Sequence, residues 1–193
     1  MPSNRHKDLL AAARETVLAV GVRRTTLVDV ARRAGVSRMT IYRTFPDVAS
    51  LVSALMTAEF AGLIDDVTRA ASGLPTGRER LVAATVHATR AIPNNVVFRR
   101  VADVDPELLL PYVVERLGTT QRAALDLLRA WIEEGQRDGS IRRGDARLLA
   151  HSVLLTTQSF VLAARISGAP PRTQALAEFR EMLDRYLRAE VAA

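Results

Sequence analysis

Residues 25–47, TTLVDVARRAGVSRMTIYRTFPD, predict two short helices joined by a tight turn. Thr26 can cap the first helix, with Asp29 three residues later where a capping box carries its acid. Gly35 provides the stop, because glycine readily adopts the left-handed conformation that ends a helix. Each helix spans only about two turns, which is marginal in isolation, so neighbouring helices must hold both of them.

The second helix begins at a serine and ends before a proline. Ser37 can cap it, and Pro46 prevents its continuation beyond about Thr44. Two helices of about eight residues around a glycine turn have the spacing of a DNA-binding helix-turn-helix. The small shared core is expected to contain Val30, Ala31, Val36 and Ile41.

The outward face of the second helix carries side chains that suit contact with nucleic acid. We expect this face to comprise Arg38, Met39, Thr40, Tyr42 and Arg43. Arginine can pair with guanine edges or phosphates, threonine and methionine can contact the thymine methyl group, and tyrosine can donate to a phosphate. The alternative interpretation is a helical hairpin with an ordinary polar outer face.

Positive charge is concentrated in the first quarter of the chain. The 193 residues carry a formal charge of +6. Residues 1–50 hold nine basic and four acidic side chains, whereas the other 143 residues hold 18 and 17. This distribution is expected of a surface that meets a polyanion, although a solvated basic face without a partner has the same composition.

Composition argues against enzymes, metal sites and membrane spans. Cysteine is absent, and His6, His87 and His151 are too scattered for metal-ligand spacing. We find no glycine-rich phosphate loop and no catalytic Ser or acid pair, so we expect neither an enzyme nor a cofactor. No apolar run reaches about 18 residues, and the start, MPSNRHKDLL, lacks the apolar centre of a signal peptide. We therefore expect a cytoplasmic protein with no membrane partner.

The helix-turn-helix and its flanks resemble the amino-terminal domain of TetR-family transcriptional repressors. The resemblance covers about residues 8–55 and rests on Gly21, Thr25, Thr26, Val30, Ala31, Ala34, Gly35, Val36, Ser37, Tyr42, Phe45 and Leu51. A weaker echo, EEGQRDGSIRRGDARLLA at 133–150, resembles the regulatory domain of one branch of the family. This chain departs from the family pattern at Met39, Thr44 and Val48, where Gly, His or Tyr, and Lys are usual. These departures concern the choice of operator rather than DNA binding itself.

The resemblance implies an all-α fold with two domains, and apolar residues recurring three and four apart along the chain agree with it. Residues 1–46 would form a three-helix DNA-binding domain. Residues 47–193 would form a helical ligand-binding and dimerisation domain, with helix 47–71 as the connector. The residues expected to contact DNA are Arg23, Arg24, Thr25, Thr26, Ser37, Arg38, Met39, Thr40, Tyr42, Arg43 and Thr44.

Two further surfaces are expected in the larger domain. The dimer interface would lie on the last two long helices, at Leu148, Leu155, Leu162, Leu176, Phe179, Leu183, Tyr186 and Leu187. A pocket for a small, largely apolar inducer would be lined by Met56, Phe60, His87, Arg90, Phe98, Tyr112, Trp131 and Gln158. Packing in the monomer's own core is the alternative for both sets.

The expected function is a homodimeric, ligand-responsive transcriptional repressor. It would bind a quasi-palindromic operator on double-stranded DNA and be released by a small-molecule inducer. The alternative is a helical small-molecule binding protein whose DNA recognition is weakened or lost, in keeping with the missing lysine at Val48.

Overall fold

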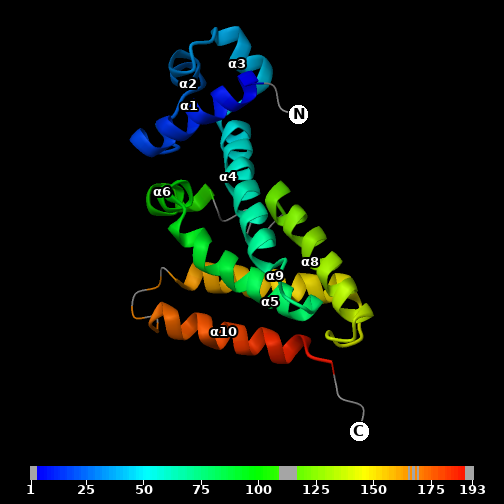
Figure 1. Cartoon of the computed structure of the whole chain (residues 1–193). Helices are drawn as coiled ribbons and strands as arrows, with labels where there is room; N and C mark the ends of the chain where they lie inside the picture. Colours follow the sequence, from blue (N-terminus) through cyan, green and yellow to red (C-terminus); the bar gives the residue numbers. More distant parts are fainter. Residues whose placement is uncertain (1–3, 109–116, 165, 167, 169, 190–193) are drawn as a thin grey trace. The chain divides into compact units, whose positions relative to one another are not determined.

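The computed structural model describes residues 4–108, 117–164, 166, 168 and 170–189 (Figure 1). Within these ranges the regular elements are helices, with one isolated β-bridge between Ile141 and Arg188. The all-α fold class is therefore confirmed. The chain packs as two units, Met1–Ala61 with Asn94–Gly118 and Gly62–Pro93 with Thr119–Ala193. The expected functional division at residue 46 stays a prediction.

The first unit contains the helix-turn-helix. Its helices are α1 (Asn4–Val20), α2 (Leu27–Arg33), α3 (Arg38–Thr44), the first part of α4 (Val48–Ala71), α6 (Val96–Val104) and the short 3-10 helix η2 (Pro106–Leu108). The expected caps are present: the Thr26 hydroxyl accepts from the Asp29 N–H at 3.1 Å, and the Ser37 hydroxyl accepts from the Thr40 N–H at 3.2 Å. Gly35 has a φ of 67°, so glycine is required in the turn between α2 and α3.

One apolar core holds the helices of the first unit together. Its fully buried members include Leu9 and Val17 of α1, Val30 of α2, Ile41 of α3, Leu51 of α4 and Val97 of α6. Helix α6 follows the helix-turn-helix by about fifty residues, yet it shares the same core. The helix-turn-helix is thus held by α1, α4 and α6 together, which explains how two seven-residue helices persist.

The second unit is built from the end of α4 and four further helices. These are α5 (Gly77–Ala91), α8 (Thr119–Arg137), α9 (Ala146–Ala163) and α10 (Arg172–Leu187), with the short 3-10 helix η1 (Ile92–Asn94) after α5. A capping box starts α5, since the Thr76 hydroxyl accepts from the Glu79 N–H while the Glu79 carboxylate accepts from the Thr76 N–H. Asp145 caps α9, its carboxylate accepting from the Arg147 N–H at 2.8 Å.

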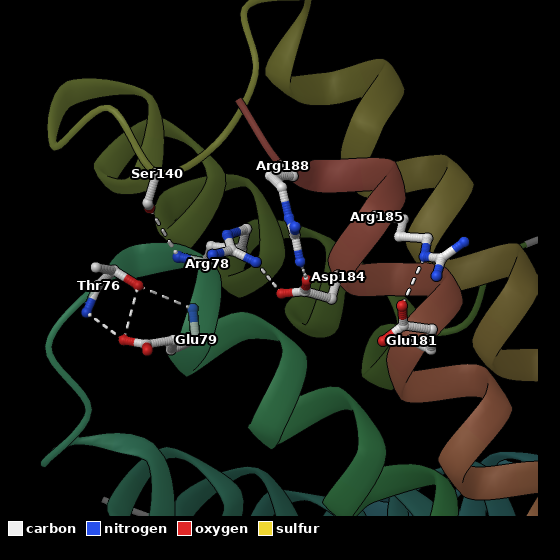
Figure 2. A network of polar contacts seen from close by, with 8 residues as sticks. All are labelled: Thr76, Arg78, Glu79, Ser140, Glu181, Asp184, Arg185 and Arg188. Carbon is white, nitrogen blue, oxygen red and sulfur yellow. Dashed lines mark hydrogen bonds and ion pairs between the residues drawn. The ribbon is translucent and has the colours of Figure 1, made fainter. Parts of the chain in front are cut away.

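A polar network joins α5 to α10 in the second unit (Figure 2). Arg78 of α5 forms an ion pair with Asp184 of α10, and Asp184 also pairs with Arg188. The Arg78 N–H donates to the Ser140 hydroxyl at 3.1 Å. The side chains of Arg78 and Asp184 are only 20% and 22% exposed, so this pair is partly shielded from solvent.

A second carboxylate, Asp138, holds the start of α5 against the end of α8. It accepts from the Gly77 N–H at 2.7 Å and from the Ser140 N–H at 2.9 Å. Burial alone would raise the pKa of Asp138, but hydrogen bonds from Ser140 and Gly77, together with the charge of Arg80, lower it. Asp138 is therefore held as a carboxylate.

Helix α4 bears on whether the chain has a helix that could span a membrane. It is 24 residues long and includes an 18-residue window of mean hydropathy 1.5, so by length and composition alone it could cross a membrane. Core helices of soluble proteins meet the same criterion; here 17% of that window is buried, and Leu51 and Leu55 of α4 pack in the core of the first unit. Length and composition are thus weak evidence for a span.

Candidate DNA-binding surface

Helix α3 presents its polar face to solvent and anchors its apolar face in the core. Ile41 is fully buried, and Phe45 at the end of the helix is 4% exposed. On the opposite face Met39 is 76% exposed and Tyr42 is 52% exposed. The other exposed members of the predicted set on or next to α3 are Ser37, Arg38, Arg43 and Thr44, while Thr40 is half-buried. The hydroxyls of Ser37 and Thr40 lie 2.9 Å apart, so their hydrogen-bonding capacity is partly used within the helix.

The basic residues of the first fifty positions divide into paired and unpaired groups. Arg14, Arg23, Arg32 and Arg33 form ion pairs with carboxylates of the same unit. The other five are exposed and have no partner in the part of the chain that the structure describes. They are Arg5, Lys7, Arg24, Arg38 and Arg43. Unpaired cations are those free to meet phosphate, so they outline the candidate surface.

Two of these cations, Arg5 and Lys7, were not among the residues predicted to contact DNA. The ring of His6, between them in sequence, lies 5.5 Å from the ring of Phe45, measured between centroids. Figure 1 accordingly shows the first turn of α1 beside α3. Their charge was visible in the sequence, but only the His6–Phe45 contact shows that the first turn of α1 lies next to α3.

The turn between α1 and α2 holds the remaining predicted residues in different ways. Arg24 is exposed, whereas Thr25 is buried and its hydroxyl donates to the Gly21 carbonyl at 2.8 Å. Thr26 is exposed, but its hydroxyl caps α2. Arg23 is bound by two carboxylates: its Nε lies 2.8 Å from Glu107 and 3.5 Å from Asp105. Burial gives Thr25 a structural role in this turn.

Glu107 is stabilised in its charged form. The hydrogen bond from its own backbone N–H is the largest influence and lowers the pKa of Glu107. Burial acts in the opposite direction, and Arg23 lowers the pKa further through its hydrogen bond and its charge. The carboxylate facing Arg23 is therefore ionised at neutral pH.

The residues predicted to line a ligand pocket are divided between the two units. Met56, Phe60 and Phe98 lie in the first, where the rings of Phe60 and Phe98 pack edge to face with centroids 6.3 Å apart. The second unit contains His87, Arg90, Trp131 and Gln158. His87 and Arg90 are exposed on α5, Gln158 is half-buried on α9, and Trp131 packs against the apolar cluster of Val67, Ala71 and Ala84. Tyr112 lies outside the described residues, and the pocket stays a prediction.

The residues predicted to form the dimer interface differ in their exposure to solvent. Four of them, all on α10, are buried within the chain: Leu176, Phe179, Leu183 and Leu187. On α9, Leu148 is 66% exposed and Leu155 is 56% exposed, while Leu162 is half-buried. Tyr186 of α10 is also exposed. The apolar surface open to a partner therefore comprises Leu148 and Leu155, with Leu162 and Tyr186 contributing in part.

Comparisons with known proteins identify the family of the chain. The model of a family described as bacterial regulatory proteins, tetR family, matches residues 9–55. Over 180 residues the chain is 38% identical to an uncharacterised HTH-type transcriptional regulator of Mycobacterium bovis, covering 93% of this chain and 92% of that protein.

Solved structures share the fold at lower identity. A protein of unknown function from Rhodococcus sp. RHA1 superimposes with a TM-score of 0.72 at 22% identity, covering 97% of this chain and 99% of that one. The regulator FadR from Bacillus subtilis, in complex with stearoyl-CoA, gives 0.67 at 17% identity, covering 94% and 99%. Taken with the family match and the mycobacterial relative, the chain belongs to the tetR family of bacterial transcriptional regulators, which are not enzymes.

Proposed function

We propose that this protein is a ligand-responsive transcriptional repressor that binds a quasi-palindromic operator as a homodimer. The observation that carries the proposal is the outward face of α3, where Met39 and Tyr42 are exposed while Ile41 is fully buried. A short helix anchored on one side and polar on the other can enter the major groove, with its side chains reaching base edges.

The unpaired cations supply the sequence-independent part of binding. Arg5, Lys7 and Arg24 flank the helix-turn-helix in sequence, and each phosphate they neutralise releases counterions and strengthens the complex. Arg38 and Arg43 on α3 can contact either phosphates or guanine edges.

Ligand control and dimerisation are supported more indirectly. Half-buried Met56 and Phe60, with Phe60 packed edge to face on the buried Phe98, offer apolar contacts to a small ligand. FadR of Bacillus subtilis, which shares the fold, binds stearoyl-CoA. The exposed leucines of α9 support a homodimer, because a C2 interface buries the same apolar patch on both copies. Release from DNA requires that the ligand bind the free protein more tightly than the operator-bound form.

A second candidate is a ligand-binding protein with weakened DNA recognition. It is favoured by the start of α4, where Val48 replaces the usual lysine and the Asp47 carboxylate caps the helix through the Ser50 N–H. An acidic cap without a neighbouring cation is a poor phosphate site. Operator affinity separates the two candidates.

The test is a fluorescence-anisotropy titration of duplex DNA that flanks the protein's own gene, repeated over a series of salt concentrations. We expect Arg38→Ala to weaken binding by about 1–3 kcal/mol if Arg38 pairs with a base, with Tyr42→Phe causing a smaller loss. Arg185→Ala, an exposed arginine of the second unit, is the control and should leave affinity unchanged. Normal affinity in the Arg38→Ala, Tyr42→Phe double variant would contradict the assigned contacts. Absence of binding by the unmodified protein would favour the second candidate.

A further inference from the structure

Two adjacent arginines in the α1–α2 turn have opposite surroundings. Arg24 is exposed and has no ion-pair partner among the described residues. Arg23 is also exposed, with 70% of its side chain accessible, but it faces two carboxylates from the segment after α6. Its Nε and Nη2 atoms lie 2.8 Å and 2.5 Å from the same Glu107 oxygen. Arg23 is therefore occupied and Arg24 is free.

A buried hydrogen bond next to Arg23 holds the turn against the segment after α6. Asp105 is fully buried and accepts from the Val22 N–H at 2.8 Å. Its other oxygen has no hydrogen-bond donor within the described residues, and the nearby cation is Arg23 at 3.5 Å. The turn approaches closely here, since a Cβ on Gly21 would lie 3.1 Å from Val104. The Val22–Asp105 hydrogen bond keeps Arg23 within reach of Glu107.

The Arg23–Glu107 ion pair is weak enough for another anion to replace Glu107. Glu107 is 46% exposed, and ion pairs between exposed side chains are screened by water and salt. A carboxylate and a phosphate offer a guanidinium the same kind of anionic oxygen. Glu107 already supplies that anionic oxygen to both the Nε and the Nη2 of Arg23. A DNA phosphate approaching the turn thus meets an arginine that is already neutralised.

We propose that Glu107 competes with operator phosphate for Arg23 and so restrains operator affinity. The inference rests on the proposed function, because it assigns a role to Glu107 in the same DNA complex. With Glu107 charged, Arg23 adds nothing to the salt dependence of binding. When the charge of Glu107 is removed, Arg23 becomes a further phosphate contact.

The experiment uses the full chain and the flanking-DNA duplex described above, and measures the slope of log affinity against log salt concentration. Four proteins are compared: the unmodified chain, Glu107→Gln, Arg23→Ala, and the double variant. We expect Glu107→Gln to bind several-fold more tightly at low salt. The slope of log affinity against log salt for this variant should steepen by about 0.9 for each DNA-binding domain, or about 1.8 for a dimer. Arg23→Ala alone should leave the slope unchanged, and it should abolish the gain in the double variant.

Matched controls come from the neighbouring arginine and from an ion pair elsewhere. Arg24→Ala should flatten the slope by about 0.9 per head, because that arginine is already free. Glu181→Gln removes the same charge from the exposed Glu181–Arg185 pair of the second unit and should change nothing. Thermal unfolding of each variant checks that Gln at a half-exposed position leaves the fold intact.

Two results would overturn the inference while leaving the proposed function in place. One is a Glu107→Gln variant that binds no more tightly than the unmodified chain. Equal affinity would mean that Glu107 does not compete with phosphate, and weaker binding would mean that Glu107 orients Arg23 for DNA. The other is a flatter slope for Arg23→Ala alone, which would place Arg23 on phosphate despite Glu107. Failure of the unmodified chain to bind DNA in a salt-dependent way would overturn the proposed function and the competition together.

Discussion

At the residue scale, Gly77 determines how closely the start of α5 approaches α8, and Gly135 makes room for Ile141. A Cβ built on Gly77, the first residue of α5, would lie 2.5 Å from the backbone nitrogen of Gly135 in α8. On Gly135 itself, a Cβ would lie 2.5 Å from the Ile141 side chain. Because the atom facing Gly77 belongs to the backbone, a side-chain rotation cannot relieve the clash. The two helices can approach this closely because Gly77 carries no side chain, while Gly135 leaves space for the Ile141 side chain.

Replacement of Gly77 by alanine is therefore expected to destabilise the protein. We expect a loss of about 1–3 kcal/mol in the free energy of unfolding, the usual cost of overpacking. The measurement is urea unfolding followed by circular dichroism. Gly62→Ala is the control, since it lies within α4 with nothing within 4 Å of its added Cβ. That variant should gain about 0.5–1 kcal/mol from helix propensity. Equal stabilities for the two variants would contradict the proposed packing constraint.

Single residues were predictable where their partners are local. Ser37 and Thr26 cap the helices that follow them, and each cap depends only on residues up to three positions away. Arg23 was expected to reach phosphate, but it binds Asp105 and Glu107, more than eighty positions along the chain. Nothing in the local sequence signals a partner at that separation.

At the scale of helices, one shared carboxylate contributes to the contact between α10 and α5. Asp184 pairs with both Arg78 and Arg188, and the Arg78 Nε has no hydrogen-bond partner within the described part of the chain (Figure 2). Removal of Asp184 would leave Arg78, 20% exposed, with its charge uncompensated at this contact. Such a group costs more than the loss of an exposed pair.

We accordingly expect Asp184→Ala to lower the free energy of unfolding by about 1–3 kcal/mol. Glu181→Ala, one turn earlier on α10, removes a carboxylate whose pair with Arg185 is 51% and 75% exposed. That control should lose less than about 0.5 kcal/mol. Both variants can be compared by thermal and urea unfolding. A similar effect from both substitutions would show that partial burial of the Arg78–Asp184 pair adds no stability.

Helix boundaries were mostly predictable, whereas helix placement was not. The capping box at Thr76 and Glu79 and the cap at Asp145 involve only residues up to three positions apart, so such boundaries follow from local sequence. The position of α6 in the core of the first unit is different, because Val97 and Val101 form an apolar pattern that could pack against any helix. Periodicity shows which face of a helix is buried, but it does not identify the neighbouring helix.

At the scale of the whole molecule, the proposed homodimer depends on apolar surface that the monomer leaves open. Leu148 and Leu155 are seven residues apart on α9, so they lie on one side of the helix, and both are more than half exposed. The buried leucines of α10 already contribute to the chain's own core. Only the exposed set can gain from pairing with a second copy.

A charge on the exposed leucines should therefore separate the subunits without unfolding them. We expect Leu148→Asp combined with Leu155→Asp to sediment as a monomer at micromolar concentration and to lose operator affinity, because the two heads are no longer linked. Val96→Asp, on an apolar residue of α6 that is 46% exposed, is the matched control and should remain a dimer. A monomeric unmodified protein would contradict the dimer proposal directly.

The exposure of Met39 also affects how the protein should be handled. Its thioether lies on α3 at 76% exposure, in a chain that has no cysteine to react first with an oxidant. Peroxide converts methionine to the sulfoxide, which replaces an apolar contact with a polar, chiral group. Oxidation in an aged preparation would thus alter the outward face of α3, the proposed recognition helix, without touching the buried core. Each affinity measurement should be accompanied by mass spectrometry that quantifies oxidation of Met39.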